Sequence, residues 1–130
     1  MLASTLWGLL ASLLYHSVSE GVGGTSLGKL SLGYRVIGED SKPCGFGAAA
    51  LRSLAYFADA FFFGIPAYQS MKDNPNNQRL GDKWAKTIVI KASAAPASAV
   101  RSSSLVAVGL MGGMAAHVTV MAISVIAKVL

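Results

Sequence analysis

The chain of 130 residues contains one cysteine, and only 13% of its residues are charged. Soluble globular proteins average about 25% charged residues, so this composition is far from that of a water-soluble domain. Cys44 has no second cysteine with which to form a disulfide inside the chain. No group of cysteine and histidine residues has the spacing of a zinc site. We therefore expect neither a disulfide framework nor a metal site.

Catalytic signatures are also absent from the sequence. There is no nucleophile elbow, no HExxH motif, no phosphate-binding loop and no carboxylate pair at a spacing suited to acid–base catalysis. The net charge of +5 is not gathered into a basic patch interleaved with aromatic residues, which would be typical of a nucleic-acid-binding protein. We expect a protein that is not an enzyme, uses no cofactor and binds no nucleic acid.

Two long stretches, residues 1–19 and 102–127, carry no formally charged side chain. A hydrocarbon core of about 30 Å needs about 20 mostly apolar residues to cross it as a helix. We predict one membrane span over residues 2–17 and a C-terminal transmembrane helix over residues 104–127. An Ala/Ser/Pro linker, residues 92–103, precedes the second span.

The C-terminal span carries two local signals. Ser102, Ser103 or Ser104 can cap its N-terminus, because a serine hydroxyl accepts hydrogen bonds from unpaired backbone N–H groups. Gly109 and Gly113 lie four residues apart, a small-residue pattern that favours close contact with another helix in lipid.

Residues 44–71 form a third apolar stretch that is too long for one crossing and too short for two. The stretch is broken at Gly64 and Pro66, so it is either one tilted span or a re-entrant hairpin. Both flanking segments, residues 20–43 and 72–91, are basic, and basic residues accumulate on the cytoplasmic side. The charges therefore favour a hairpin that enters and leaves by the cytoplasmic face.

Two segments have the pattern of strands. The alternation of apolar and polar residues from Leu30 to Val36 predicts a half-buried strand, after the glycines that follow Glu20 have broken the first helix. Residues 87–90 are mostly β-branched and also predict a strand. Pairing residues 87–90 with residues 34–37 would give a two-stranded ribbon at the cytoplasmic face, which a hairpin permits and a single crossing forbids.

Arg52 and Asp59 are ionisable residues inside the third apolar stretch, where insertion of a charge costs about 2.5 to 3.5 kcal/mol. Two interpretations remain open. In the first, Arg52 extends to the interface and Asp59 pairs with a loop residue such as Arg79. In the second, Asp59 titrates in a cation or proton path. Asp82 is expected to cap a helical turn or to pair with Arg52, so Arg52, Asp59 and Asp82 are our candidate polar centre.

A group of lysines in the second basic segment is expected to face anionic lipid headgroups. Trp84 lies among them and suits the same headgroup zone. The group consists of Lys72, Lys83, Lys86 and Lys91.

Several motifs occur in a characteristic order: Gly28-Lys29, Leu32 to Ile37, Ala50-Leu51-Arg52, Gln78 to Asp82, and Lys86 to Ile90. In this order they resemble the RDD family of small membrane proteins over residues 2–91. The motif residues are Gly28, Lys29, Arg79, Gly81 and Thr87. Relative to the family pattern, Lys86 stands where glycine is usual, the first helix with its own arginine and aspartate is missing, and the span after Ser104 is additional.

The resemblance implies a polytopic helical architecture and transport of unidentified ligands, with sodium/proton antiport suggested for some members. We predict an all-α, small polytopic helical membrane protein of the bacterial inner membrane, with its N-terminus outside. It would be transport-related or accessory to a transport complex, and would act as a homo- or hetero-oligomer. The alternative is a non-transporting scaffold that binds anionic lipid or a partner protein through its basic cytoplasmic face.

Overall fold

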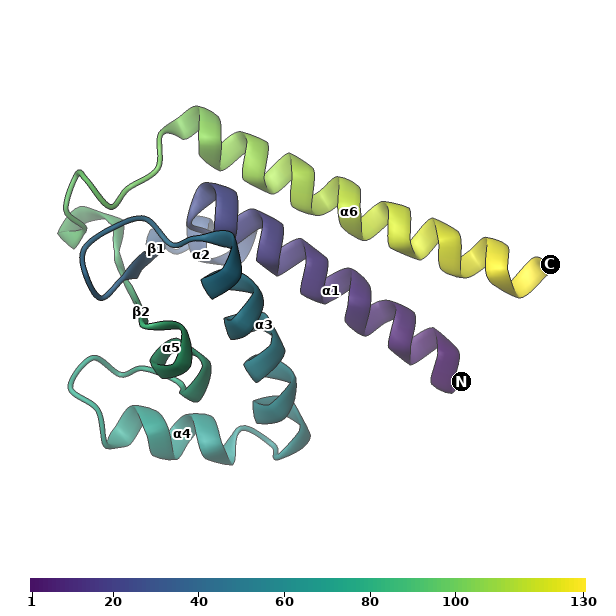
Figure 1. Cartoon of the computed structure of the whole chain (residues 1–130), viewed down its shortest axis with the longest axis horizontal. Coiled ribbons are helices and arrows are strands. Elements are labelled where there is room, and N and C mark those ends of the chain that lie inside the picture. Colours follow the sequence, from purple (N-terminus) through teal and green to yellow (C-terminus); the bar gives the residue numbers. More distant parts are fainter.

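The computed structural model describes all 130 residues and is mostly helical, with one small sheet (Figure 1). This agrees with the predicted helical class and with the predicted ribbon. In chain order the elements are α1 (Leu2–Gly23), α2 (Leu27–Ser31), β1 (Tyr34–Gly38), α3 (Phe46–Phe61), α4 (Ile65–Lys72), α5 (Leu80–Ala85), β2 (Thr87–Lys91), a 3₁₀ turn η1 (Ala92–Ala94) and α6 (Ser103–Val129).

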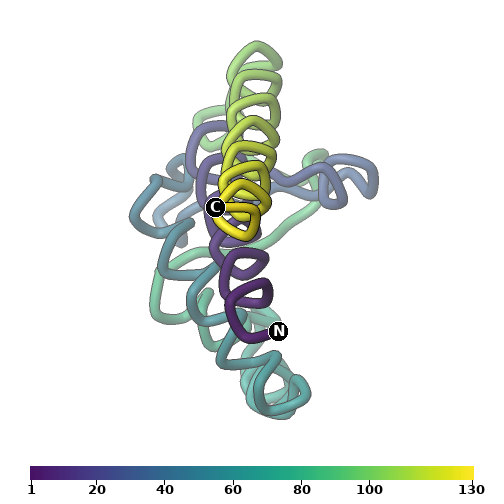
Figure 2. The backbone as a smooth tube through the Cα atoms, turned by 90° about the vertical axis from the view of Figure 1, so that its right-hand side faces the viewer, coloured from purple at the N-terminus to yellow at the C-terminus, as the bar shows by residue number.

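The helix α1 lies between the other long elements. It packs against α6 on one side and against α3 on the other, and the two views of the backbone agree on this order (Figures 1 and 2). The helices α1 and α6 run antiparallel, so the two chain termini lie at the same end of the molecule. The polar elements α2, α5 and the ribbon gather towards the other end.

The first helix is longer than predicted. We expected glycines to break it after Glu20, but α1 continues to Gly23 and ends where Gly24 takes a left-handed conformation with φ of 70°. The glycines are kept in the helix by close packing: a Cβ on Gly21 would lie 2.7 Å from the Cα of Phe46. Tertiary contact has therefore outweighed the low helix propensity of glycine.

Glycines also set the contact between α1 and α6. A Cβ on Gly109 would lie 2.8 Å from the backbone nitrogen of Gly23, and one on Gly113 would lie 2.8 Å from the carbonyl oxygen of Tyr15. The predicted small-residue contact is thus present, and its partner is α1 of the same chain. At the start of α6, the Ser102 hydroxyl accepts the N–H of Leu105 at 3.4 Å, which confirms one of the three predicted caps.

The apolar stretch 44–71 contains two helices rather than one straight helix. The axes of α3 and α4 differ by 114° across the break. Gly64, with φ of 77°, precedes α4, and proline lies in the first turn of that helix, where its missing N–H costs nothing. The chain therefore turns back at this point, and α5 lies against both α3 and α4.

The ribbon forms with β1 and β2 antiparallel, and its register runs from Tyr34 opposite Lys91 to Gly38 opposite Thr87. The prediction that the strand begins at Leu30 is wrong, because residues 27–31 form the short helix α2. The alternating pattern spans two structures here. Gly33, with φ of 74°, provides the turn between them.

The burial pattern is the reverse of that in a soluble protein. Twelve of the buried residues are polar or charged and ten are hydrophobic, and no leucine, phenylalanine or methionine is among them. Large apolar side chains lie outside instead, and in the most apolar window of α6 only 22% is buried. Lipid, rather than water, is the solvent that such a surface fits.

One helix, α6, is long and apolar enough by itself to cross a membrane, and α3 with α4 would qualify if the bent pair were one span. The expected span over residues 2–17 does not qualify. Its helix α1 carries four serines and the polar ring of His16, which lower its hydropathy. Multiple crossings therefore stay a prediction.

Candidate polar site between three helices

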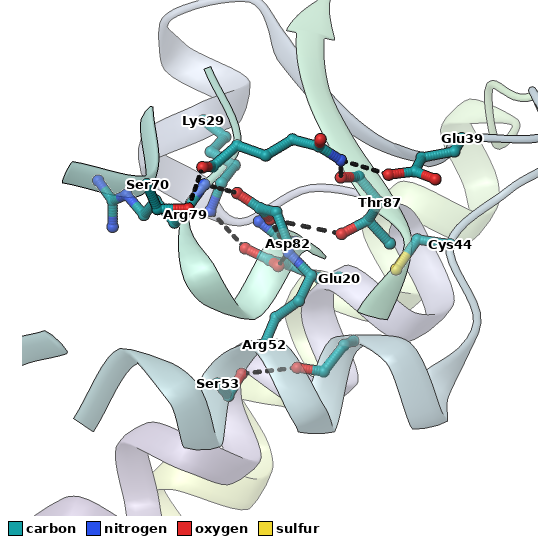
Figure 3. A network of polar contacts seen from close by, with 12 residues as sticks. Glu20, Lys29, Glu39, Cys44, Arg52, Ser53, Ser70, Arg79, Asp82 and Thr87 are labelled. Atoms are coloured by element: carbon teal, nitrogen blue, oxygen red, sulfur yellow. Dashed lines mark hydrogen bonds and ion pairs between the residues drawn. The ribbon is translucent and has the colours of Figure 1, made fainter. Parts of the chain in front are cut away.

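The centre of the site is the guanidinium of Arg52, which α3 directs towards α1 and α5 (Figure 3). Its Nε donates to Oδ1 of Asp82 at 2.5 Å, and its Nη1 donates to Oε2 of Glu20 at 2.5 Å. The Arg52 side chain is 11% exposed and the two carboxylates are less exposed still. Ion pairs that are removed from water in this way are strong only while both partners are present.

Lys29 extends this arrangement to a fourth element. Its ammonium on α2 pairs with Oε1 of Glu20, the oxygen that Arg52 leaves free. We call Lys29, Glu20, Arg52 and Asp82 the charged quartet. It joins α2, α1, α3 and α5, and its two positive and two negative charges cancel.

Asp82 performs both of the roles predicted for it. In addition to its pair with Arg52, its Oδ2 accepts the backbone N–H of Arg79 at 3.1 Å, which caps the start of α5. The Thr87 hydroxyl donates to Oδ1 of Asp82 at 3.4 Å. One carboxylate thus fixes α3, the start of α5 and the start of β2 relative to one another.

Gly81 permits the close approach of α5 to α3. A Cβ at this position would lie 2.7 Å from the Cβ of Ala55 and 3.2 Å from the carbonyl oxygen of Arg52. A larger side chain would push Asp82 away from Arg52. The glycine of the Gln78 to Asp82 motif is therefore needed to build the charged quartet.

Beside the charged quartet lies a cavity of about 180 Å³ between α1, α3 and α5. Asp59 lines this cavity, is 5% exposed and has its Oδ1 without any hydrogen-bond partner. A buried polar atom without a partner is costly and therefore calls for an explanation. The other polar residues that line the cavity, apart from the charged quartet, are Ser12, His16, Ser53, Tyr56 and Arg79.

The predicted pair between Asp59 and Arg79 is not formed. The four ion pairs within 4.0 Å include neither residue, and no dashed line reaches the guanidinium of Arg79 in Figure 3. Among the neighbouring charges, Arg79 attracts the Asp59 carboxylate most strongly and Asp82 repels it. The two residues therefore face one cavity as separate charges.

The structure brings most of the predicted site residues together. Arg52 and Asp82 are in direct contact, and Asp59 shares their cavity without touching either one. Of the motif residues, Lys29, Arg79, Gly81 and Thr87 surround the same centre, whereas Gly28 has open space around it. The lysines predicted to face lipid headgroups are all exposed: Lys72, Lys83, Lys86 and Lys91.

Two members of the site were missed from the sequence. Glu20 accepts from both Lys29 and Arg52, and His16, one helical turn earlier on the same helix, lines the cavity rather than the membrane interface. Glu20 is the first charged residue after a neutral stretch of 19 residues. An acid in that position was the available signal, because ionisable groups near membrane depth mark polar centres.

Cys44, outside the helices, is buried at 1% exposure. Burial raises the pKa of its thiol to about 11, because the charged thiolate is disfavoured away from water. A thiol in this state is a poor nucleophile, so Cys44 serves packing rather than chemistry.

A family model described as the RDD family matches residues 1–86. The chain belongs to the RDD family. The match includes every residue of the charged quartet and of the cavity, while α6 follows it. No curated protein and no solved structure gives a significant match.

The departure of this RDD protein from the usual Ala-Gly-Thr motif now has a structural meaning. Lys86 stands in the glycine position and takes a left-handed conformation, with φ of 53° and ψ of 50°. Glycine adopts that conformation without a steric penalty, whereas lysine has a Cβ that disfavours it. The backbone turn before β2 is therefore kept, at some cost in strain.

Proposed function

We propose that this RDD protein is a multi-pass membrane protein of the bacterial inner membrane that is transport-related or accessory to a transport complex. In this proposal α6 crosses the bilayer, α1 lies along it, and α3 with α4 re-enters from the cytoplasmic face. The exposed apolar surface and the polar interior support the lipid environment.

Two features support the re-entrant arrangement. The strands β1 and β2, which flank the α3–α4 pair in the sequence, are hydrogen-bonded to each other, so the chain returns to the place it left. Around the turn between α3 and α4, four large apolar side chains are exposed and suited to the lipid interior. They are Phe61, Phe62, Phe63 and Ile65, with exposed fractions between 55% and 93%.

The function of the polar centre rests on one observation, the unpartnered carboxylate of Asp59 in the cavity. Glu20 and Asp82 are already paired inside the charged quartet, so Asp59 is the carboxylate left to bind a cation or a proton. In our proposal Asp59 takes up and releases the cation or proton, while Arg52 and Asp82 hold the cavity in shape. An unpaired acid at membrane depth is costly, and such residues are typical of ion and proton pathways.

We further propose that the protein acts as a homo- or hetero-oligomer. A single chain offers one clear membrane-crossing helix and one bent pair, which is little material to enclose a path through a bilayer. Additional chains would supply the missing walls of the path.

Proton flux in proteoliposomes tests the proposal. The purified protein is reconstituted with a pH-sensitive dye inside the vesicles, and a sodium, potassium or lithium gradient is applied. We expect a cation-dependent pH change that Asp59→Asn abolishes and that Asp73→Asn, a change at an exposed aspartate, leaves intact. Equal flux in Asp59→Asn and the unsubstituted protein would contradict the role of Asp59, and no flux in either would contradict transport by this chain alone.

The second candidate function is a scaffold that binds anionic lipid through its cytoplasmic face. The four lysines are exposed, and the Trp84 ring, 56% exposed, lies next to Lys83 on α5. Trp and Lys side by side are typical of the headgroup zone. Thermal stabilisation of the detergent-solubilised protein by phosphatidylglycerol, and its loss when the four lysines are changed to glutamine, would support this function in the absence of flux.

A further inference from the structure

We propose that the cavity beside the charged quartet binds a small zwitterionic solute such as an α-amino acid, with its ammonium group at Asp59 and its carboxylate at Arg79. This inference rests on the proposed transport-related function and names the class of its ligand.

The charge balance of the cavity carries the inference. Three basic and three acidic residues line it, and four of these six form the charged quartet. The two that remain, Asp59 and Arg79, have opposite signs and no ion-pair partner within 4.0 Å. A lone cation would leave Arg79 without a partner, and a lone anion would leave Asp59 without one. A ligand that carries both charges satisfies both residues.

The partners differ in a way that suits such a ligand. Asp59 is 5% exposed and its Oδ1 accepts no hydrogen bond, so an ammonium group there would satisfy a buried acceptor. Arg79 is exposed and presents a planar guanidinium, which binds carboxylates in a bidentate manner. The ammonium group would therefore lie deep and the carboxylate towards the opening.

The size of the cavity limits the ligand to a small molecule. Its volume of about 180 Å³ equals that of about six water molecules in the liquid, at roughly 30 Å³ each. Drug-sized ligands occupy larger sites of about 300 to 1,000 Å³. The hydroxyls of Ser12 and Tyr56 also line the cavity and make no hydrogen bond within the protein, so they are free to bind polar atoms of the solute.

Binding to the detergent-purified full chain tests the inference by calorimetry, with glycine and L-alanine as probes. Ammonium chloride and sodium acetate serve as half-ligands that carry one charge each. We expect saturable binding of at least one amino acid, at least about tenfold tighter than either half-ligand. Asp59→Asn and Arg79→Gln should each weaken it at least about tenfold, Arg79→Lys should weaken it less, and the exposed Lys83→Gln should leave it unchanged.

Three results would overturn the inference: no binding of either amino acid, ammonium or sodium binding as tightly as the amino acids, or amino-acid binding unchanged in both charge-neutralising variants. The flux assay keeps this failure separate from failure of the proposed function. Cation-dependent flux that needs Asp59, without amino-acid binding, would overturn the zwitterion site and leave ion transport standing. A shared unfolding temperature among the variants shows that they are folded.

Discussion

The helix α1 makes two contacts of opposite kinds, one with α6 and one with α3. Towards α6 it presents the backbone at Tyr15 and Gly23 to the glycines 109 and 113, and no charge takes part. Towards α3 it presents Glu20, which meets Arg52 within the charged quartet. One face is therefore held by close backbone approach and the other by ion pairs.

The difference shows how helices that have no hydrophobic drive to associate in lipid can still be placed accurately. Close packing of small residues supplies dispersion energy and N–H or Cα–H contacts along a groove. Buried ion pairs contribute less net stability, because desolvation offsets much of the attraction, but losing one partner is severe. We expect the two contacts to respond differently to substitution.

The largest effect is expected from removal of the Arg52 charge. Arg52→Met leaves Glu20 with Lys29 as its remaining partner and leaves Asp82 without a cation, so the variant should lose about 3 to 5 kcal/mol of stability. Thermal unfolding in detergent, followed by circular dichroism, measures the loss.

Two controls sharpen that result. Arg79→Gln, which removes an exposed arginine without an ion pair, should change stability by about 0.5 kcal/mol or less. Combining Arg52→Met with Glu20→Gln and Asp82→Asn should recover most of the loss, because no uncompensated carboxylate remains. An Arg52→Met protein as stable as the unsubstituted one would refute the account of the charged quartet.

A smaller effect is expected at the glycine contact. Gly109→Ala would place its Cβ 2.8 Å from the backbone nitrogen of Gly23 and force α6 away from α1, which should cost about 1 to 3 kcal/mol. Gly8→Ala is the matched control, since nothing lies within 4 Å of its Cβ. The control should be neutral or stabilising by up to about 1 kcal/mol, because alanine favours a helix over glycine. Similar losses in both variants would mean that helix propensity, rather than the contact, decides.

The smallest effect is expected at the start of α6. Ser102→Ala removes the hydroxyl that accepts the N–H of Leu105, which typically costs about 1 kcal/mol. Ser103→Ala, where the hydroxyl makes no hydrogen bond, should be close to neutral. Hydrogen exchange at the first turn of α6 reports the difference, and equal protection in the two variants would exclude Ser102 as the cap.

The parts of this structure that were predictable are those with local signals. The break at Gly64 and Pro66, the strand pairing and the cap at Ser102 all follow from residue types at short spacing. The contact of Arg52 with Asp82 was also within reach, because few charges are available to compensate an arginine in an apolar stretch.

The parts that were not predictable depend on the packing of distant elements. Nothing local shows that α2 places Lys29 against Glu20, or that Gly21 to Gly23 stay helical because neighbours need the space. The failure of Asp59 to pair with Arg79 is likewise a matter of tertiary distance. Both residues were recognised as candidates from their type, but only the fold shows that they face one cavity separately.

The account rests centrally on the chain entering and leaving the bilayer by the same face around α3 and α4. Single cysteines at Lys42→Cys and Lys72→Cys, both exposed positions, measure this by labelling with a membrane-impermeant maleimide in intact and opened cells. The native Cys44 is changed to serine. Its raised thiol pKa of about 11 already predicts slow labelling at neutral pH, which a trial on the unsubstituted protein checks.

We predict that both cysteines remain unlabelled in intact cells and become labelled together when the cytoplasmic face is exposed. Labelling of the two positions from opposite sides of the membrane would contradict the re-entrant arrangement. The ribbon of β1 and β2 could then not exist in the membrane-embedded protein.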